Sequence, residues 1–282
     1  MSQLPPLKSD ELPAWGEYIA KACGVRLDSN KGYLIESRLG ALMRETGAES
    51  WTALLRKVKT DPTRQLHAKV ISAITTNETS FFRDQAPFQL LRHKLLPELI
   101  DRRNQERAKP IPIRILSAAC STGQEVYSTA IVLKDLLGDF EGYDIRILGL
   151  DVSPEAIAQA SYAHYSQLEL ARGVSPQQLT RYFEPVGNKW KIRDELRATA
   201  TFRQANLLEP ISAPGLFDIV FCRNVAIYFN EPDKIRMFKN LGRVLARQGA
   251  LIIGSTESIT NLCPEWEPQR YLRTLYYTKK QA

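Results

Sequence analysis

The sequence has few of the residues that build metal centres or disulfide frameworks. Its 282 residues include only four cysteines and three histidines, and no two cysteines form a C-x-x-C pair. Widely spaced cysteines in a chain of this length indicate reduced thiols in a reducing compartment. The histidines, His67, His93 and His164, share no metal-ligand spacing, so no metal site is expected.

Long hydrophobic runs are also missing. The longest apolar stretches, such as residues 250–253, have the length of a strand and are far too short to cross a bilayer. The first fifteen residues contain no basic residue followed by a long apolar run, and so lack the features of a secretory signal. These absences predict a cytoplasmic protein without membrane insertion.

The charge of the chain leaves several partners open. Its 38 Lys and Arg exceed its 31 Asp and Glu, and the formal net charge of +7 favours an acidic partner such as nucleic acid, an anionic membrane or an acidic protein. A solvated basic surface with no partner explains the same charge equally well. Hydrophobic residues make up 44% of the chain, which is enough for a sizeable core.

The pattern of apolar residues divides the chain into three parts. Residues 1–75 show helical spacing and no strand pattern, so they predict a small helical N-terminal domain. Residues 76–110 predict a polar linker loop and then a long helix from position 87 to about 107. Residues 111–282 alternate strand and helix patterns, which indicates an α/β domain with a mostly parallel sheet covered on both faces.

One segment interrupts this alternation. Residues 181–204 contain Gly187-Asn188 between two short strand patterns, which is typical of a β-hairpin. We therefore expect a small antiparallel subdomain inserted at about 181–204. The closing strand pattern, residues 272–277, has no long helix after it and is free to pair antiparallel.

A nucleoside site is expected at the ends of the first two strands of the α/β part. The small residues at 117–123 follow the first strand and let a ligand approach the backbone closely. Asp151 ends the second strand, and its two carboxylate oxygens suit two ribose hydroxyls. G-x-G-x-x-G and G-x-x-x-x-G-K-[ST] are both absent, so adenosine without pyrophosphate fits better, as in S-adenosylmethionine. An ordinary tight turn with a helix-capping aspartate explains the same local sequence.

Four motifs, in their order and approximate spacing, resemble the chemotaxis receptor methyltransferases of the CheR type. They are Thr75-Thr76-Asn77-Glu78-Thr79-Ser80-Phe81-Phe82-Arg83, Ala119-Cys120-Ser121-Thr122-Gly123-Gln124-Glu125-Val126-Tyr127-Ser128, Gly149-Leu150-Asp151 and Phe221-Cys222-Arg223-Asn224-Val225-Ala226-Ile227-Tyr228-Phe229. The resemblance covers nearly the whole chain. It implies a Rossmann-like methyltransferase domain that uses S-adenosylmethionine, releases S-adenosylhomocysteine and forms methyl esters on glutamate side chains of bacterial chemoreceptors, for chemotactic adaptation.

The resemblance also implies roles for individual residues. Those implied to bind the cofactor are Asn77, Thr79, Arg83, Glu125, Asp151, Asn206, Leu207, Arg223 and Asn224. Two residues are implied at the reacting groups, Arg83 and Tyr228. Arg83 would orient the substrate carboxylate, a role that Arg223 could also take, and Tyr228 would lie beside the methyl donor. Those implied to contact acidic faces of the receptor's helical domain are Lys31, Arg38 and Arg44. Gln124, Val126 and Ala226 depart from the family's usual residues, but none is a polar ligand in this assignment.

The implied reaction needs no general base. A free glutamate has a pKa of about 4.3 and is an anion at neutral pH, which agrees with the absence of histidine from every motif. Catalysis would come from partial desolvation and in-line positioning, which contributes about 7–11 kcal/mol in favourable cases.

The partners and the competing functions follow from smaller features. The hairpin looks short and lacks Gly-Pro-Gly, which predicts receptor binding independent of a C-terminal receptor peptide, and the absence of heptads predicts a monomer. A nucleic-acid methyltransferase would fit the charge, but Asn224-Val225-Ala226-Ile227 differs from the Asn/Asp-Pro-Pro-aromatic loop of amino-group methylation, and no RNA-binding module is recognisable. A non-catalytic adaptor would keep the fold, but the polar motif positions are intact.

Overall fold

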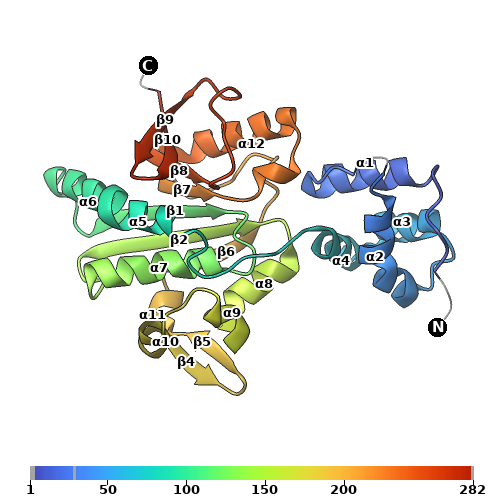
Figure 1. The fold of residues 1–282 in the computed structure, drawn as a ribbon, viewed down its shortest axis with the longest axis horizontal. Coiled ribbons are helices and arrows are strands. Elements are labelled where there is room, and N and C mark those ends of the chain that lie inside the picture. Colours follow the sequence, from blue (N-terminus) through green and yellow to red (C-terminus); the bar gives the residue numbers. More distant parts are fainter. Residues whose placement is uncertain (1–3, 28–29, 281–282) are drawn as a thin grey trace.

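The computed structural model describes residues 4–27 and 30–280. The N-terminal part consists of helices α1 (Leu12–Cys23), α2 (Gly32–Thr46), α3 (Trp51–Thr60) and α4 (Gln65–Ile74), which lie together at one end of the molecule (Figure 1). Their apolar faces share one core around Trp15, Leu39 and Trp51, all fully buried. The indole N–H of Trp15 donates to the Trp51 carbonyl, so the polar group of this large buried side chain has a hydrogen-bond partner. The helical N-terminal domain expected from the spacing is confirmed.

A linker, residues 75–84, connects this bundle to the rest of the chain without forming helix or strand. It leads into α5 (Gln85–Leu90), the π-helical turn η1 (Leu91–Leu95) and α6 (Leu96–Gln105), which follow one another without a break. The long helix expected from position 87 is therefore present. A π turn at its centre, which periodicity does not reveal, precedes Pro97 in the first turn of α6.

The main sheet has seven strands in the order β6-β2-β1-β7-β8-β10-β9. Its members are β1 (Ile111–Ala118), β2 (Tyr143–Asp151), β6 (Ala200–Gln204), β7 (Phe217–Cys222), β8 (Leu245–Ile253), β9 (Trp266–Tyr271) and β10 (Thr274–Lys279). The five strands from β6 to β8 are parallel, so their carboxyl ends meet at one edge. The closing strand β10 runs antiparallel to β8, as its sequence allows.

Helices cover both faces of this sheet (Figure 1). They include α7 (Gln124–Leu137), α8 (Pro154–Tyr162) and α12 (Glu231–Val244). Residues of β1 serve two separate cores: Ile113 and Ile115 pack in the core that contains α5 to α7, whereas Leu116 and Ala118 pack in the core that contains α12. A strand buried on both faces reads as a nearly continuous apolar run, and this confirms the covered α/β sheet.

A separate antiparallel sheet of three strands is inserted after α8. It consists of β3 (His164–Tyr165), β5 (Lys189–Ile192) and β4 (Phe183–Val186), in that order. The short helices around it are α9 (Gln167–Ala171), α10 (Pro176–Tyr182) and α11 (Asp194–Arg197). The inserted antiparallel subdomain is present, but the expected range 181–204 needs correction at both ends.

The correction concerns β3 and β6. Strand β6 is not part of the insertion, because it pairs parallel with β2 in the main sheet. The insertion begins earlier, with β3, whose two residues are too few to give a pattern. Strand β9 was also unforeseen, because Pro268 interrupts its pattern; β9 lies at the edge of the sheet, where proline is tolerated.

Candidate active site

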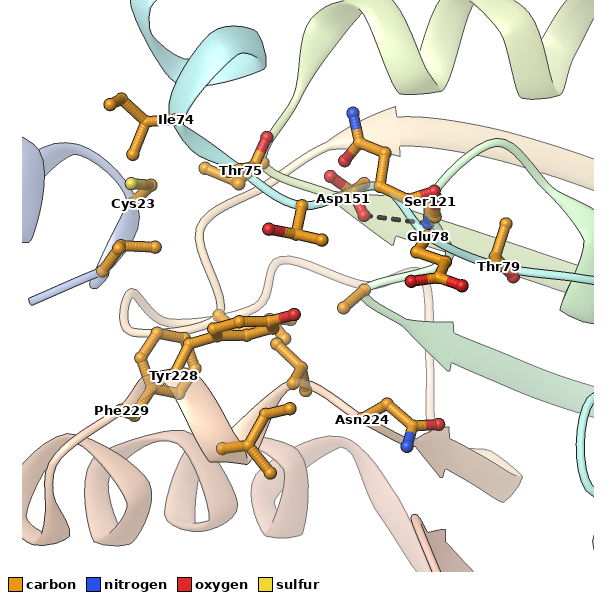
Figure 2. Close-up of a pocket in the computed structure, with 18 of the residues that line it drawn as sticks. Cys23, Ile74, Thr75, Glu78, Thr79, Ser121, Asp151, Asn224, Tyr228 and Phe229 are labelled. Atoms are coloured by element: carbon orange, nitrogen blue, oxygen red, sulfur yellow. Dashed lines mark hydrogen bonds between the residues drawn. The ribbon is translucent and has the colours of Figure 1, made fainter. Parts of the chain in front are cut away.

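A cavity of about 320 Å³ lies where the N-terminal helices, the linker and the carboxyl ends of the parallel strands meet. Every residue expected at the cofactor or at the reacting groups lines it: Asn77, Thr79, Arg83, Glu125, Asp151, Asn206, Leu207, Arg223, Asn224 and Tyr228. They come from five separate segments of the chain. Figure 2 shows Tyr228 lying opposite Thr75, Ser121 and Asp151.

Asp151 ends β2 and is 6% exposed. Its Oδ2 accepts the backbone N–H of Ser121 at 2.8 Å (Figure 2), and its Oδ1 accepts the N–H of Ser153 at 2.9 Å. Ser121 lies in the loop after β1 and has a left-handed backbone with φ 51°. Burial raises the pKa of the Asp151 carboxyl, and the bonded N–H groups offset part of that effect. Each oxygen keeps acceptor capacity for one hydroxyl of a ribose.

Arg223 follows β7 and has a buried side chain, 3% exposed. Its guanidinium donates to Glu125 Oε2 at 2.9 Å, to Asp84 Oδ2 at 2.9 Å and to the Arg83 carbonyl at 2.7 Å. Ser117 donates to the other oxygen of Glu125 at 2.7 Å. Arg223 thus joins the start of α7 to the end of the linker. This geometry favours a structural bridge over the hypothesis that Arg223 holds the substrate carboxylate.

The linker itself is held in place from the inserted subdomain. The Phe81 ring packs edge-on against Tyr165 of β3, with centroids 4.9 Å apart, and against Phe183 of β4, at 5.5 Å. A Cβ atom on Gly173 would lie 1.9 Å from the Phe81 carbonyl oxygen, so only glycine fits there. Arg83, further along the linker, donates to the Glu78 carbonyl at 3.0 Å.

The loop expected beside the adenine is fixed from two sides. The Asn206 side chain donates to the Ala22 carbonyl of α1 at 3.3 Å and accepts from the Leu208 N–H at 3.0 Å. Buried Asn240 of α12 donates to the carbonyls of Leu207 and Glu209 at 3.1 and 3.0 Å. Asn240 was not anticipated, because nothing local marks an asparagine on an amphipathic helix as a loop support.

The three basic residues expected to contact a receptor separate in the structure. Lys31 and Arg38 line the cavity, whereas Arg44 is exposed in the last turn of α2 and does not. The Arg38 guanidinium donates to the Ile74 carbonyl, to the Thr75 carbonyl at 3.4 Å and to Thr76 Oγ1 at 3.2 Å. The side chain of Arg38 therefore supports the linker, a long-range pairing that helical spacing does not predict.

Glu257 is a further residue that the sequence reasoning missed. It follows β8, the neighbour of β7 in the sheet, and its Oε2 accepts the N–H of Asn224 at 2.8 Å. An acidic residue just beyond the carboxyl end of a predicted parallel strand was the available signal, because such ends converge on the site.

The residues present fit S-adenosylmethionine. A buried carboxylate with free acceptor capacity ends β2, and the close approach to the β1 loop is provided by left-handed Ala119 and Ser121. A second carboxylate, Glu125, begins α7 and lines the same cavity. Among the described residues, no cluster of three or more His, Cys, Asp or Glu is arranged to hold a metal ion.

A covered, mostly parallel sheet with a buried carboxylate at the end of β2, and without a glycine-rich dinucleotide loop, fits the class of methyltransferases that use S-adenosylmethionine. Residues 77–272 match the family model described as CheR methyltransferase, SAM binding domain, and residues 10–75 match CheR methyltransferase, all-alpha domain. The chain therefore belongs to the CheR family of methyltransferases, and it acts in chemotaxis with S-adenosylmethionine as its cofactor.

Curated relatives match over most of their length. Chemotaxis protein methyltransferase Cher2 of Pseudomonas putida is 37% identical over 250 residues, covering 87% of this chain and 89% of that protein. Chemotaxis protein methyltransferase 1 of Pseudomonas aeruginosa is 38% identical with the same coverage. Chemotaxis protein methyltransferase of Vibrio anguillarum is 35% identical over 277 residues, 97% of this chain and 98% of that protein.

The raised pKa of Asp151 predicts a pH dependence of cofactor binding. Only the ionised carboxylate accepts two hydroxyls, so affinity for S-adenosylhomocysteine should fall as pH decreases through that pKa, at a higher pH than for an ordinary aspartate. Because the pKa in the folded state lies above the unfolded value, ionisation of Asp151 destabilises the fold as pH rises through the same window. Calorimetric titrations from about pH 7 to about pH 4 measure the affinity. Asp151→Asn should lack this step, and a flat wild-type profile would contradict the assignment.

Proposed function

We propose that this chain transfers the methyl group of S-adenosylmethionine to glutamate side chains on the cytoplasmic helical domain of chemoreceptors, forming methyl esters in chemotactic adaptation. The supporting observation is the composition of the cavity: two carboxylates suited to the cofactor, Glu125 and Asp151, stand with Arg83 and Tyr228 in one enclosure. None of its described lining residues is a histidine. A carboxylate nucleophile needs no base to remove a proton, so the absence of a histidine from these residues is compatible with ester formation.

The reaction neutralises two opposite charges, the positive sulfonium of the cofactor and the negative carboxylate of the glutamate. S-adenosylmethionine supplies a sulfonium methyl group, and the glutamate oxygen forms the new O–CH3 bond as the S–CH3 bond breaks, leaving S-adenosylhomocysteine. Arg83 orients the substrate carboxylate, and Tyr228 lies beside the methyl donor. Because Arg223 is already paired with Glu125 and Asp84, Arg83 is the better candidate for the substrate.

The parts of the cofactor are assigned to successive positions along the cavity, from the adenine to the methionine end. Asn206 and Leu207 flank the adenine, and Asp151 holds the ribose. The residues assigned to the methionine end and the surrounding wall are Glu125, Arg223, Asn224, Asn77, Thr79 and Arg83. This order follows the order of the strands, because the loop at Asn206 follows β6, Asp151 ends β2, and Arg223 follows β7.

Receptor recognition is assigned to the basic side of the N-terminal helices, with Lys31, Arg38 and Arg44. Since Arg38 also supports the linker, Arg44 is the cleaner site to test. Arg44→Glu is expected to raise KM for receptor about fivefold, because each exposed ion pair contributes about 1 kcal/mol, and to leave KM for the cofactor unchanged. Arg56→Glu on α3 is the matched control. Equal receptor KM values for the two variants would remove Arg44 from the interface.

The domain boundaries, the independence from a receptor peptide, the oligomeric state and the location are proposed together with this function. The division at residue 75, with a linker and helix over 76–110 and a methyltransferase domain over 111–282, agrees with where the helical bundle ends. The β4–β5 hairpin has only Gly187 and Asn188 between its strands, which supports receptor binding without a C-terminal receptor peptide. A cytoplasmic monomer is proposed. In the described part of the chain, each helix is too short or too polar to cross a bilayer.

Transfer of labelled methyl from S-adenosylmethionine to receptor-containing membranes tests the function. Label should appear on the receptor and be released as methanol by mild alkali, because glutamate esters hydrolyse under those conditions. Binding of S-adenosylhomocysteine without transfer would indicate a non-catalytic adaptor. Label that entered added RNA, and not the receptor, would indicate a nucleic-acid methyltransferase.

A further inference from the structure

Glu257 occupies a position that neither the cofactor nor the substrate assignment uses. It lies in a turn after β8 that is closed by its own N–H, which donates to the Gly254 carbonyl at 3.0 Å. The side chain is buried and folds back, so that Oε2 accepts two backbone N–H groups at 2.8 Å, one from Gly254 and one from Asn224. One carboxyl oxygen thus joins the loops at the carboxyl ends of β7 and β8.

The bonded Asn224 has an unusual backbone. Its φ is 57°, in the left-handed region that costs most residues free energy and that asparagine tolerates better than others. Such a conformation persists only when its surroundings hold it. The N–H that donates to Glu257 belongs to the peptide between Arg223 and Asn224, so Glu257 acts directly on the strained unit.

The orientation of that peptide matters to the cavity. Among the described peptides only Lys109–Pro110 is cis, so the peptide between Arg223 and Asn224 is trans. In a trans peptide the carbonyl points opposite to the N–H, and the Arg223 carbonyl is therefore turned away from Glu257. Both residues line the cavity and Glu257 does not, so Glu257 supports this wall from behind.

Local packing alone does not account for a carboxyl group here. Oε1 of Glu257 is buried and has no hydrogen-bond partner among the described residues. Such an atom carries a desolvation cost, and in native proteins it calls for an explanation. The turn is also shaped around the carboxyl, because a Cβ on Gly254 would lie 2.5 Å from Glu257 Oε2.

We propose that Glu257 is a positioning residue for methyl transfer: it fixes the peptide between Arg223 and Asn224 against the methionine end of the cofactor. Its carboxyl oxygen holds Asn224 in the left-handed conformation and keeps the two strand ends in register. The role rests on the cofactor site and the methyltransferase activity, and it does not depend on which protein accepts the methyl group.

The test compares buried carboxyl groups at opposite ends of the sheet. Asp218, in β7, is also buried, accepts the Arg114 N–H at 2.9 Å, pairs with Arg103 at 3.0 Å and does not line the cavity. Glu257→Ala is expected to weaken S-adenosylhomocysteine binding about tenfold and to lower kcat by at least that factor, with KM for receptor unchanged. Glu257→Gln keeps an acceptor oxygen and should stay within about threefold of the wild type. Asp218→Ala should lower the melting temperature at least as much as Glu257→Ala, with affinity for S-adenosylhomocysteine within about threefold of the wild type.

Each outcome decides the matter. The proposal would be overturned if Glu257→Ala kept wild-type affinity for S-adenosylhomocysteine and wild-type kcat. It would also be overturned if Glu257→Gln lost as much affinity and kcat as Glu257→Ala, or if Asp218→Ala did. If Glu257→Ala does not fold, Glu257→Asp, which is one methylene shorter, replaces it in the same comparison. Calorimetry with S-adenosylhomocysteine needs no receptor, so a wild-type protein that fails to methylate receptors would defeat the proposed function and leave this test intact.

Discussion

Replacing Arg223 with methionine is expected to lower turnover at least about a hundredfold, because the linker that carries Arg83 loses its bridge to Glu125 and a small misplacement has effects of that size. The free energy of unfolding should fall by about 3 kcal/mol, since the Glu125 carboxylate, with only 12% of its side chain exposed, loses its charged partner. Urea unfolding and initial rates at saturating cofactor measure the two effects.

Two further variants separate these effects. Arg223→Met combined with Glu125→Gln should recover part of the stability and none of the turnover, because the unpaired charge is gone but the bridge is not restored. Arg114→Met removes an arginine that pairs with Asp144 on neighbouring strands away from the cavity, and should leave turnover near the wild-type value. An Arg223→Met protein with normal turnover would show that the bridge is not needed for activity.

Asp151→Asn is expected to weaken binding of S-adenosylhomocysteine about a hundredfold. Two hydroxyl groups lose a charged acceptor, and hydrogen bonds to charged groups contribute about 1.5–3 kcal/mol each. Because asparagine has nearly the same size as aspartate, the change in affinity measures the loss of the charged acceptor and not a change in side-chain volume. Isothermal titration calorimetry measures the affinity directly.

The matched control for Asp151→Asn is Asp144→Asn. Both aspartates belong to β2, but Asp144 lies near the amino end and pairs with Arg114 and Arg146. Its substitution should leave the affinity for S-adenosylhomocysteine unchanged. Similar affinities in the two variants would mean that the ribose is held elsewhere.

The sequence predicted the architecture because its signals are local. The apolar runs of β1 and β7 and the helical spacing before residue 75 each depend on neighbours a few positions away. The residues around the cavity were identified from motif order, and the structure brings them together because parallel strands end at one edge. Strand β3 escaped prediction since two residues have no period, and β6 was placed in the wrong sheet since alternation does not name a partner strand.

Side-chain partners across the chain were the least predictable part. Arg38 was placed on a receptor-facing helix, yet its guanidinium meets carbonyls nearly forty positions later. Arg223 was expected at the methionine end, and it lines the cavity, but its ion pairs with Glu125 and Asp84 were not foreseen. Glu257 carried no motif at all. Such pairings depend on the final packing of distant segments, and propensity and periodicity contain no information about them.

The helical bundle does more than carry the basic residues that we propose for receptor binding. Cys23, Arg26, Lys31 and Arg38, all from the first forty residues, form part of the wall around the nucleoside pocket. Two regions that match separate family models therefore complete one enclosure. A fragment that encoded only the second region would lack these side chains of the wall, so chimaeras between relatives should exchange Val25, Arg26 and Lys31 together with the cavity that they line.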